Sequence, residues 1–269
     1  TTLSNSVMYE DNAGIVIGPD TVQDPNAVLT LTGNINIRSN SPTSQGSIFI
    51  GFGSAGNTNG GTGGRNTAIG LLTLSDLTDG DSNTALGYKA LENCTTGSSN
   101  VAIGYFAANT NETGSQNIAI GGSAYEDAVG GLNNIALGIN SLRRCQQSNN
   151  VAIGFIALSS LETGGGNNTV IGTQAMANGV AHNYATAVGY QSGYATGGGT
   201  TSYTNSVYLG AFARPLAGVD STNEIVLGAE TTGAGTNTAT YGNTLIENHY
   251  FTGGNIITSG SVKVADDAA

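Results

Sequence analysis

The sequence predicts an all-β fold, a parallel β-solenoid (β-roll) of about ten coils of 17 residues each. Three observations support this prediction. A glycine recurs at nearly constant spacing, a short apolar segment precedes each copy, and glycine supplies 42 of the 269 residues while charged residues make up only 9%. Self-similarity at a fixed period of this length is typical of solenoids, in which each repeat buries apolar side chains against its neighbours.

The repeat is anchored on the glycine that closes each "xAIG" tetrad. The steps between successive anchors are 17, 17, 17, 17, 16, 18, 17, 21 and 18 residues. The anchors are Gly70, Gly87, Gly104, Gly121, Gly138, Gly154, Gly172, Gly189, Gly210 and Gly228. The segment "SIFIG", ending at Gly51, fits as an earlier copy, and "GIVIG", ending at Gly18, as a distant one.

The tetrad predicts a strand with two different faces, because side chains along a strand alternate. A large aliphatic residue precedes each anchor and a mostly β-branched residue stands two positions earlier, so both share one face, which we expect to be buried. The position between them is alanine in seven coils, from Ala68 to Ala187. Something must pack closely on this alanine face, either the opposite wall of the same coil or another subunit. Since one narrow coil buries little apolar surface, we expect association between chains and place that contact on the alanine face.

The rest of the coil also repeats. A small residue three positions past the anchor, often followed by a large one such as Leu74 or Tyr125, predicts a second short strand after a glycine turn. Tyr88 and Tyr105 each come directly after an anchor, so we expect their rings to stack about 5 Å apart. An asparagine before most of the β-branched residues predicts a ladder of amides hydrogen-bonded along the stack. The ladder residues are Asn66, Asn83, Asn100, Asn117, Asn134, Asn150 and Asn168.

The copies "NTALGYKAL", "NVAIGYFAA" and "NNVAIGFIAL" resemble the head repeats of trimeric autotransporter adhesins, and still more the "NTAIGxxAL" arrays of bacteriophage tail fibres. The resemblance covers residues 47–228, about two-thirds of the chain. It implies a left-handed parallel β-roll, assembled as an intertwined homotrimer with a role in attachment. The 17-residue coil is longer than the adhesin unit, which favours the fibre.

The resemblance also suggests the domain organisation. Residues 1–46, with "GIVIGPDTVQDPNAVLTLTGNINI", are similar to strand-rich shaft units of such fibres and are expected to form a shaft or capping segment. Residues 47–228 form the β-roll. Residues 229–269 end in "GNIITSGSVKVADDAA", which resembles the strand-rich segment that precedes a self-cleaving chaperone in many fibres.

Charge and hydropathy limit the range of partners. The net charge is −11 with only seven Lys and Arg residues, scattered except for Arg143 and Arg144, so we expect no nucleic-acid partner. No apolar run of about 18 residues is present, so we expect no membrane insertion. The expected location is extracellular, on a virion tail or, alternatively, on a bacterial surface.

The sequence offers little for catalysis, and we expect no enzyme activity. Cys94 and Cys145 occupy the same place in coils three apart, too far apart for a disulfide and without a histidine nearby, so buried or loop thiols are expected. The segment "SDLTDGD" places Asp76, Asp79 and Asp81 in a glycine turn, where carboxylates could hold Ca²⁺ or simply face solvent. No other cofactor is expected.

The strongest binding candidate is the segment where the period lengthens to 21 residues. Its tyrosines, with one histidine and one glutamine, have the flat aromatic faces and polar tips that suit sugar rings. The candidate glycan ligands are His182, Tyr184, Tyr190, Gln191, Tyr194, Tyr203 and Tyr208. The alternative is that these tyrosines fill a wider coil or pack between subunits.

Together these features predict a structural and receptor-binding part of a phage tail fibre that attaches to host surface glycans. The alternatives are a bacterial trimeric adhesin head and a purely structural shaft without a ligand. An ice-binding solenoid is disfavoured, because threonine is not kept at one register: Thr67 and Thr84 give way to Val101 and Ile118.

Overall fold

The computed structural model describes residues 8–11, 14–17, 46–54, 63–161, 164–179, 181–194 and 202–245. Over these ranges the chain contains strands and turns and no helix. Residues 1–37 and 38–269 form two compact units.

The described part of the first unit is a β-hairpin. β1 (Met8–Asp11) pairs antiparallel with β2 (Gly14–Ile17), with Met8 opposite Ile17. Because β2 contains most of "GIVIG", the prediction that this segment is a distant solenoid coil is wrong. Residues 18–45 of the expected shaft segment lie outside the described residues.

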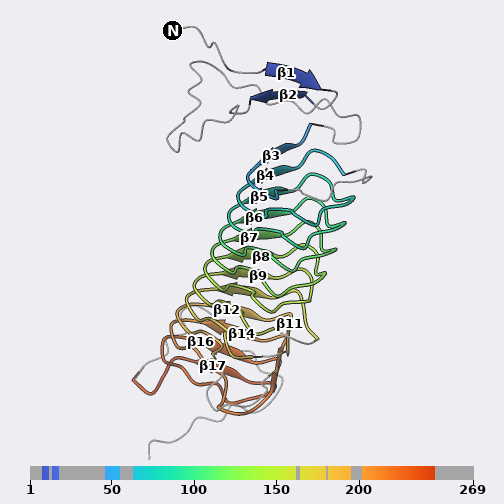
Figure 1. Ribbon diagram of the computed structural model, residues 1–269. Helices are drawn as coiled ribbons and strands as arrows, with labels where there is room; N and C mark the ends of the chain where they lie inside the picture. The colour runs from blue at the N-terminus through green and yellow to red at the C-terminus, as the bar shows by residue number, and fades with distance from the viewer. Residues whose placement is uncertain are drawn as a thin grey trace, which may run out of the picture. The chain divides into compact units, whose positions relative to one another are not determined.

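The second unit is a parallel β-solenoid, as predicted. One three-residue strand from each coil joins a 12-stranded sheet, and Figure 1 shows these strands stacked one above the other with wide loops between them. The strands are β3 (Ile48–Ile50), β4 (Thr67–Ile69), β5 (Thr84–Leu86), β6 (Val101–Ile103), β7 (Ile118–Ile120), β8 (Ile135–Leu137), β9 (Val151–Ile153), β10 (Thr169–Ile171), β12 (Thr186–Val188), β14 (Val207–Leu209), β16 (Ile225–Leu227) and β17 (Ala239–Tyr241). Equivalent residues of the repeat lie side by side in the sheet, with Ala85 beside Ala102 and Ala102 beside Ala119. β17 extends the sheet beyond residue 228, where the sequence repeat ends.

The regular coils lack the predicted second strand and have a run of turns instead. Residues two and four positions past the anchor adopt left-handed backbone angles, as at Lys89 (φ 56°) and Leu91 (φ 51°). Their N–H groups bond in opposite directions along the stack, Lys89 to the Leu71 carbonyl and Leu91 to the Ala107 carbonyl, each at 3.0 Å. The turns therefore pair with both neighbouring coils without becoming a strand.

A second sheet forms only where the coils change near the C-terminal end of the stack. β11 (Ala181–Asn183), β13 (Ser202–Thr204) and β15 (Ser221–Thr222) pair in parallel as a three-stranded sheet. These strands lie shortly before the next strand of the main sheet and not three residues past the anchor, so the second strand predicted after the glycine turn is absent there as well.

The alanine face points into the coil. Ala85, Ala102 and Ala119 are fully buried and belong to one core cluster with Leu91 and Leu142, which lie beyond the turn. The alanines therefore pack against the opposite wall of their own coil, which is one of the two predicted alternatives. Placing the inter-chain contact on this face is wrong.

The opposite strand face is outward, so the expectation that its aliphatic residues are buried is wrong for a single chain. Leu86 is 44% exposed and Ile120 39% exposed. We call the outward residues immediately before the anchors the aliphatic stripe. Its most exposed members are Ile50, Ile69, Leu86, Ile120, Ile171, Val188 and Leu209.

The asparagine ladder is present inside the coil. The backbone N–H of Asn100 donates to Asn83 Oδ1 at 2.9 Å, and Asn100 Nδ2 donates to the Gly114 carbonyl at 2.8 Å. The same pair of bonds recurs at Asn83 and Asn117. Each amide thus links one coil to the next and also closes its own coil, which agrees with the structural role predicted for the ladder.

Candidate functional site

The structure divides the seven predicted glycan residues into two groups. His182, Tyr203 and Tyr208 are fully buried, which excludes them as direct ligands of a glycan. Tyr184 and Tyr190 are exposed, and Gln191 and Tyr194 are partly buried.

The buried group fills the wider coils. The His182 ring stacks on Tyr203 with centroids 4.7 Å apart, and Tyr203 lies 5.4 Å from Tyr208. The Tyr208 hydroxyl donates to Glu224 Oε2 at 2.9 Å. Burial lowers the pKa of His182 to about 4, so the ring is neutral near pH 7. These three side chains fit the alternative interpretation, in which aromatic residues occupy an enlarged interior.

The filled interior alters the turn after the anchor in these coils. Most coils place a large buried residue four positions past the anchor, such as Leu142 or Met176. At Gly193, a side chain would meet Met176 Cγ at 2.8 Å and Tyr208 Cδ2 at 3.2 Å, so that space is already taken. The next coil has Arg214 at the same position, and its side chain lines a surface pocket.

This pocket has a volume of about 270 Å³ and is lined by Phe212, Arg214, Glu230 and Thr232. Tyr190 packs against one of these lining residues, since the Tyr190 and Phe212 rings meet edge to face with centroids 5.0 Å apart. We call the four lining residues the Arg214 pocket. They combine aromatic surface, one cation, one carboxylate and one hydroxyl, the set of groups that binds sugars.

Polar contacts hold the arginine in place. Arg214 Nη2 donates to Gln191 Oε1 at 2.9 Å, and Gln191 Nε2 donates to Gln174 Oε1 at 2.7 Å. Arg214 Cζ lies 4.7 Å from the centre of the Phe212 ring, a cation–π contact. Gln191 was predicted as a ligand, and here its side chain positions the guanidinium.

Arg214 differs from the other described cations in its ion pairing. Arg65, Lys89, Arg143 and Arg144 each have a carboxylate oxygen within 4.0 Å, whereas Arg214 forms no ion pair within the described residues. Its buried Nε also has no hydrogen-bond partner there. The guanidinium therefore keeps unused capacity for an anion.

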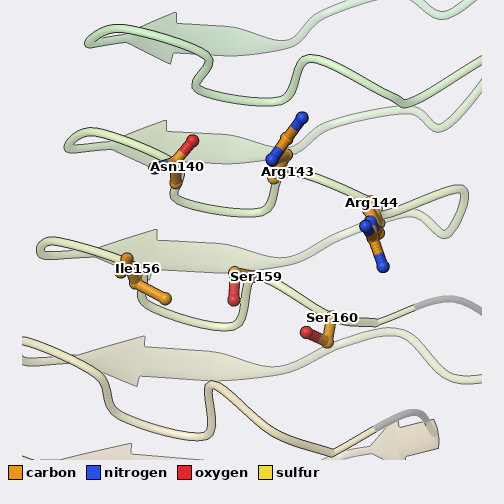
Figure 2. A pocket seen from close by; sticks show the side chains of 6 residues that line it. All are labelled: Asn140, Arg143, Arg144, Ile156, Ser159 and Ser160. Atoms are coloured by element: carbon orange, nitrogen blue, oxygen red, sulfur yellow. The ribbon is translucent and has the colours of Figure 1, made fainter.

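A second pocket, of about 240 Å³, lies between two regular coils and is shown in Figure 2. Its lining residues are Asn140, Arg143, Arg144, Ile156, Ser159 and Ser160. Arg143 points away from the coil that carries Ile156 and Ser159, and its Nε donates to Glu126 Oε2 at 3.0 Å. Arg144 lies 4.0 Å from Asp127. Both cations are thus paired with carboxylates of the chain itself, which makes this pocket the weaker anion site.

The remaining chemical candidates fall at separate places. Asp81 lies 3.4 Å from Arg65 Nη2, while Asp76 and Asp79 are exposed. No three His, Cys, Asp or Glu residues in the described ranges lie close enough together to hold a metal ion, so the structure does not form the predicted calcium site. Cys94 and Cys145 are buried free thiols, and burial raises the pKa of each to about 12.

The aromatic ladder has the predicted geometry. Tyr88 and Tyr105 stack with centroids 5.4 Å apart and planes inclined by 21°. Phe106 packs against both rings, and Lys89 lies over Phe106 at 5.6 Å. Because Lys89 is paired with Glu92 at 2.9 Å, this cluster offers no unpaired cation.

Sequence reasoning missed Phe212, Arg214, Glu230 and Thr232. One signal was available: Arg214 is a charged residue in a column of the repeat that most other coils fill with an apolar side chain. A charge at such a position indicates a local change in the interior, which the structure shows.

Neither a protein-family model nor a curated protein sequence matches this chain. Among the residues described, no helix has the length and apolar character needed to cross a membrane.

Proposed function

We propose that this chain is a non-enzymatic, structural and receptor-binding part of a phage tail fibre, assembled as a homotrimer outside the cell. The aliphatic stripe is the observation that carries this proposal. It repeats on the outward face of consecutive strands about 4.8 Å apart, so it forms a continuous apolar strip along the stack.

A continuous apolar strip is unusual on a soluble monomer, where exposed apolar residues are mostly scattered. Covering it with the same strip on two other chains would bury one aliphatic row per chain around a common axis. The contact then uses the outward aliphatic face and leaves the alanine face to the interior of each coil. The resemblance to trimeric fibre and adhesin repeats points to the same assembly.

The attachment role rests on the surface features of the last coils. Tyr190 is 45% exposed and its ring packs against Phe212, which lines the Arg214 pocket, where aromatic and polar groups meet. Rigid repeats present such sites at a fixed distance from the surface to which the fibre is anchored. Host surface polysaccharide is therefore the proposed receptor.

A glycan array tests the attachment role directly. We expect the labelled full chain to bind a subset of bacterial polysaccharides, and Tyr190→Ala to abolish the signal because it removes the exposed ring. Tyr241→Ala, another exposed tyrosine (55%), is the matched control and should bind like the wild type. A chain that binds no glycan would indicate a purely structural shaft, and a gene located beside a stalk and membrane anchor would indicate a bacterial adhesin head.

A further inference from the structure

We propose that the Arg214 pocket binds a sugar that carries a carboxylate, with the Arg214 guanidinium as the anion-binding group. This assignment rests on the proposed attachment function and specifies the class of glycan. It uses Phe212, Glu230 and Thr232, which no pattern in the sequence identifies as ligands.

The charge distribution is the first argument for an acidic ligand. A chain with a net charge of −11 repels anions in general, so anion binding needs a local cation that is not neutralised. Among the Lys and Arg residues that the structure describes, Arg214 is the one with no carboxylate of another described residue within 4.0 Å. Its partner in the folded chain is a neutral amide oxygen, at Gln191.

The fixed position of the guanidinium is the second argument. The hydrogen bond to Gln191 and the cation–π contact with Phe212 both restrain the guanidinium of Arg214. Gln191 is itself fixed by Gln174 on the preceding coil. A side chain held in this way loses little conformational freedom when it binds, and its planar fork matches the two oxygens of a carboxylate.

The remaining groups suit the uncharged part of a sugar. Tyr190 offers an exposed ring for the C–H face of a pyranose, while Thr232 and Glu230 can exchange hydrogen bonds with its hydroxyls. The volume of about 270 Å³ is slightly below the range of roughly 300–1,000 Å³ typical of drug-sized ligands, so it suits one terminal or branching sugar.

Glu230 also distinguishes a carboxylate from a phosphate. A carboxylate in the pocket repels a second anion, and a phosphate group brings up to two charges whereas a sugar carboxylate brings one. The second pocket supports the same chemistry from inside the chain, because there Arg143 already binds the carboxylates of Glu126 and Asp127. Arg214, in contrast, has no carboxylate oxygen within 4.0 Å among the described residues.

Titration of the full chain with defined sugars tests the assignment. The probes are trigalacturonate and sialyllactose as carboxylated sugars, lactose as the neutral sugar, and glucose 1-phosphate as the phosphorylated one, with binding measured by ligand-observed NMR. We expect both carboxylated sugars to bind and the other two to bind at least about tenfold more weakly. Lactose has no anion to pair with the Arg214 guanidinium, and the phosphate of glucose 1-phosphate is repelled by Glu230. Lactose or glucose 1-phosphate binding as tightly as trigalacturonate would overturn the assignment.

Two substitutions identify the anchoring residue. Arg214→Gln keeps a polar side chain near Gln191 and removes the charge, so the affinity for trigalacturonate should fall about tenfold or more. Arg144→Gln removes the same unit of charge from the second pocket and should leave the affinity unchanged. Equal affinity of Arg214→Gln and wild type, with the far-UV spectrum unchanged, would overturn the role of Arg214.

The pocket assignment and the proposed homotrimer can be refuted independently of each other. Light scattering on the titrated samples gives the oligomeric state independently of sugar binding. A trimer that binds none of the sugars would remove the pocket assignment and leave the assembly standing. A monomer that binds trigalacturonate through Arg214 would keep the pocket and remove the homotrimer.

Discussion

At the scale of single residues, the buried asparagine explains how a coil with so little apolar content holds its shape. A buried backbone group without a partner costs free energy, and the turns of a narrow coil leave such groups facing inward. Asn117 satisfies two of them: its Nδ2 donates to the Gly131 carbonyl at 2.8 Å, and its Oδ1 accepts from the backbone N–H of Asn134 at 2.9 Å. An amide is suited to this position because it both donates and accepts.

Replacing this asparagine should therefore destabilise the stack. We expect Asn117→Ala to lower the free energy of unfolding by about 2–4 kcal/mol, because two buried backbone groups lose their partners. Urea denaturation monitored by circular dichroism measures the effect. Gln146→Ala removes an exposed amide and is the control, with an expected change of less than about 0.5 kcal/mol. Equal stabilities of the two variants would show that the ladder is not a source of stability.

His182 makes the stability of the last coils depend on pH. The pKa of the ring is about 4 in the folded chain and near the ordinary value of 6.5 in the unfolded chain, because burial disfavours the charged form. The unfolded state thus binds more protons between these values. The stability that the neutral ring provides is complete above pH 6.5 and falls by about 3 kcal/mol as the pH drops towards 4.

The test compares wild type with His182→Gln, which cannot titrate in this range. We expect the difference between their thermal midpoints to change between pH 7 and pH 4.5, with the wild type losing more. Carboxylates that titrate in both proteins cancel in the comparison. A constant difference across this range would contradict the buried, neutral histidine.

At the scale of the coil, the anchor glycine sets the spacing between neighbouring turns. Gly121 has φ 134°, a region that side chains rarely adopt, and a Cβ there would lie 2.7 Å from the carbonyl carbon and oxygen of Gly138. The next residue, Gly122, has open space where its Cβ would be. Two adjacent glycines therefore have different roles, one required by the stack and one not.

This pair provides a matched experiment. We expect Gly121→Ala to destabilise the fold by about 2–4 kcal/mol, because both the backbone angle and the approach to Gly138 become unfavourable. Gly122→Ala should change stability by less than about 1 kcal/mol. Thermal unfolding of the two variants side by side measures the contrast, and similar midpoints would show that the anchor glycine does not limit the spacing of the coils.

Sequence periodicity predicted the strands because each occupies the same three positions before an anchor, and the register is determined once Ala85 and Ala102 are aligned. It did not predict the turns after the anchor. Residues such as Lys89 and Leu91 adopt left-handed angles there, although neither type favours them, because hydrogen bonds to both neighbouring coils fix the backbone. The intrinsic backbone preference of a residue therefore does not predict its conformation where hydrogen bonds between stacked coils determine it.

The direction of the two strand faces was also not determined by the sequence. Alternation showed that Ala102 and Ile103 face opposite ways, but burial of the larger residue is the usual outcome. Here the interior is narrow enough that alanine fits it, and opposing side chains such as Leu91 supply the remaining volume. The aliphatic residue then lies outside, which is reasonable only if something else covers it.

Only part of the candidate site could be predicted from the sequence. The break in the period located the segment and gave Tyr190 and Gln191. His182 and Tyr208 lie in the same aromatic-rich segment as the exposed tyrosines. Residue type alone does not tell which of these side chains are buried and which are exposed, so only the structure could separate them. For Arg214 the sequence held one signal, a charge in a column of the repeat that is mostly apolar, but that signal does not show that Phe212, Glu230 and Thr232 line one pocket with it.

At the scale of the whole molecule, the central claim is that the aliphatic stripe lies between chains. Leu86 and Ile120 are on its outward face, and neither forms part of the buried core of its own coil. Replacing both with glutamine should therefore weaken association while the solenoid keeps its backbone hydrogen bonds. The circular dichroism spectrum of this double variant should match that of the wild type.

Light scattering of the full chain at several concentrations tests this claim most directly. We expect a stable mass near three times the 26.9 kDa of one chain, and a smaller mass for the Leu86→Gln, Ile120→Gln double variant at the same concentrations. A wild-type chain that is folded and has a mass of 26.9 kDa at every concentration would contradict the account, because the aliphatic stripe would then be stable in water without a partner.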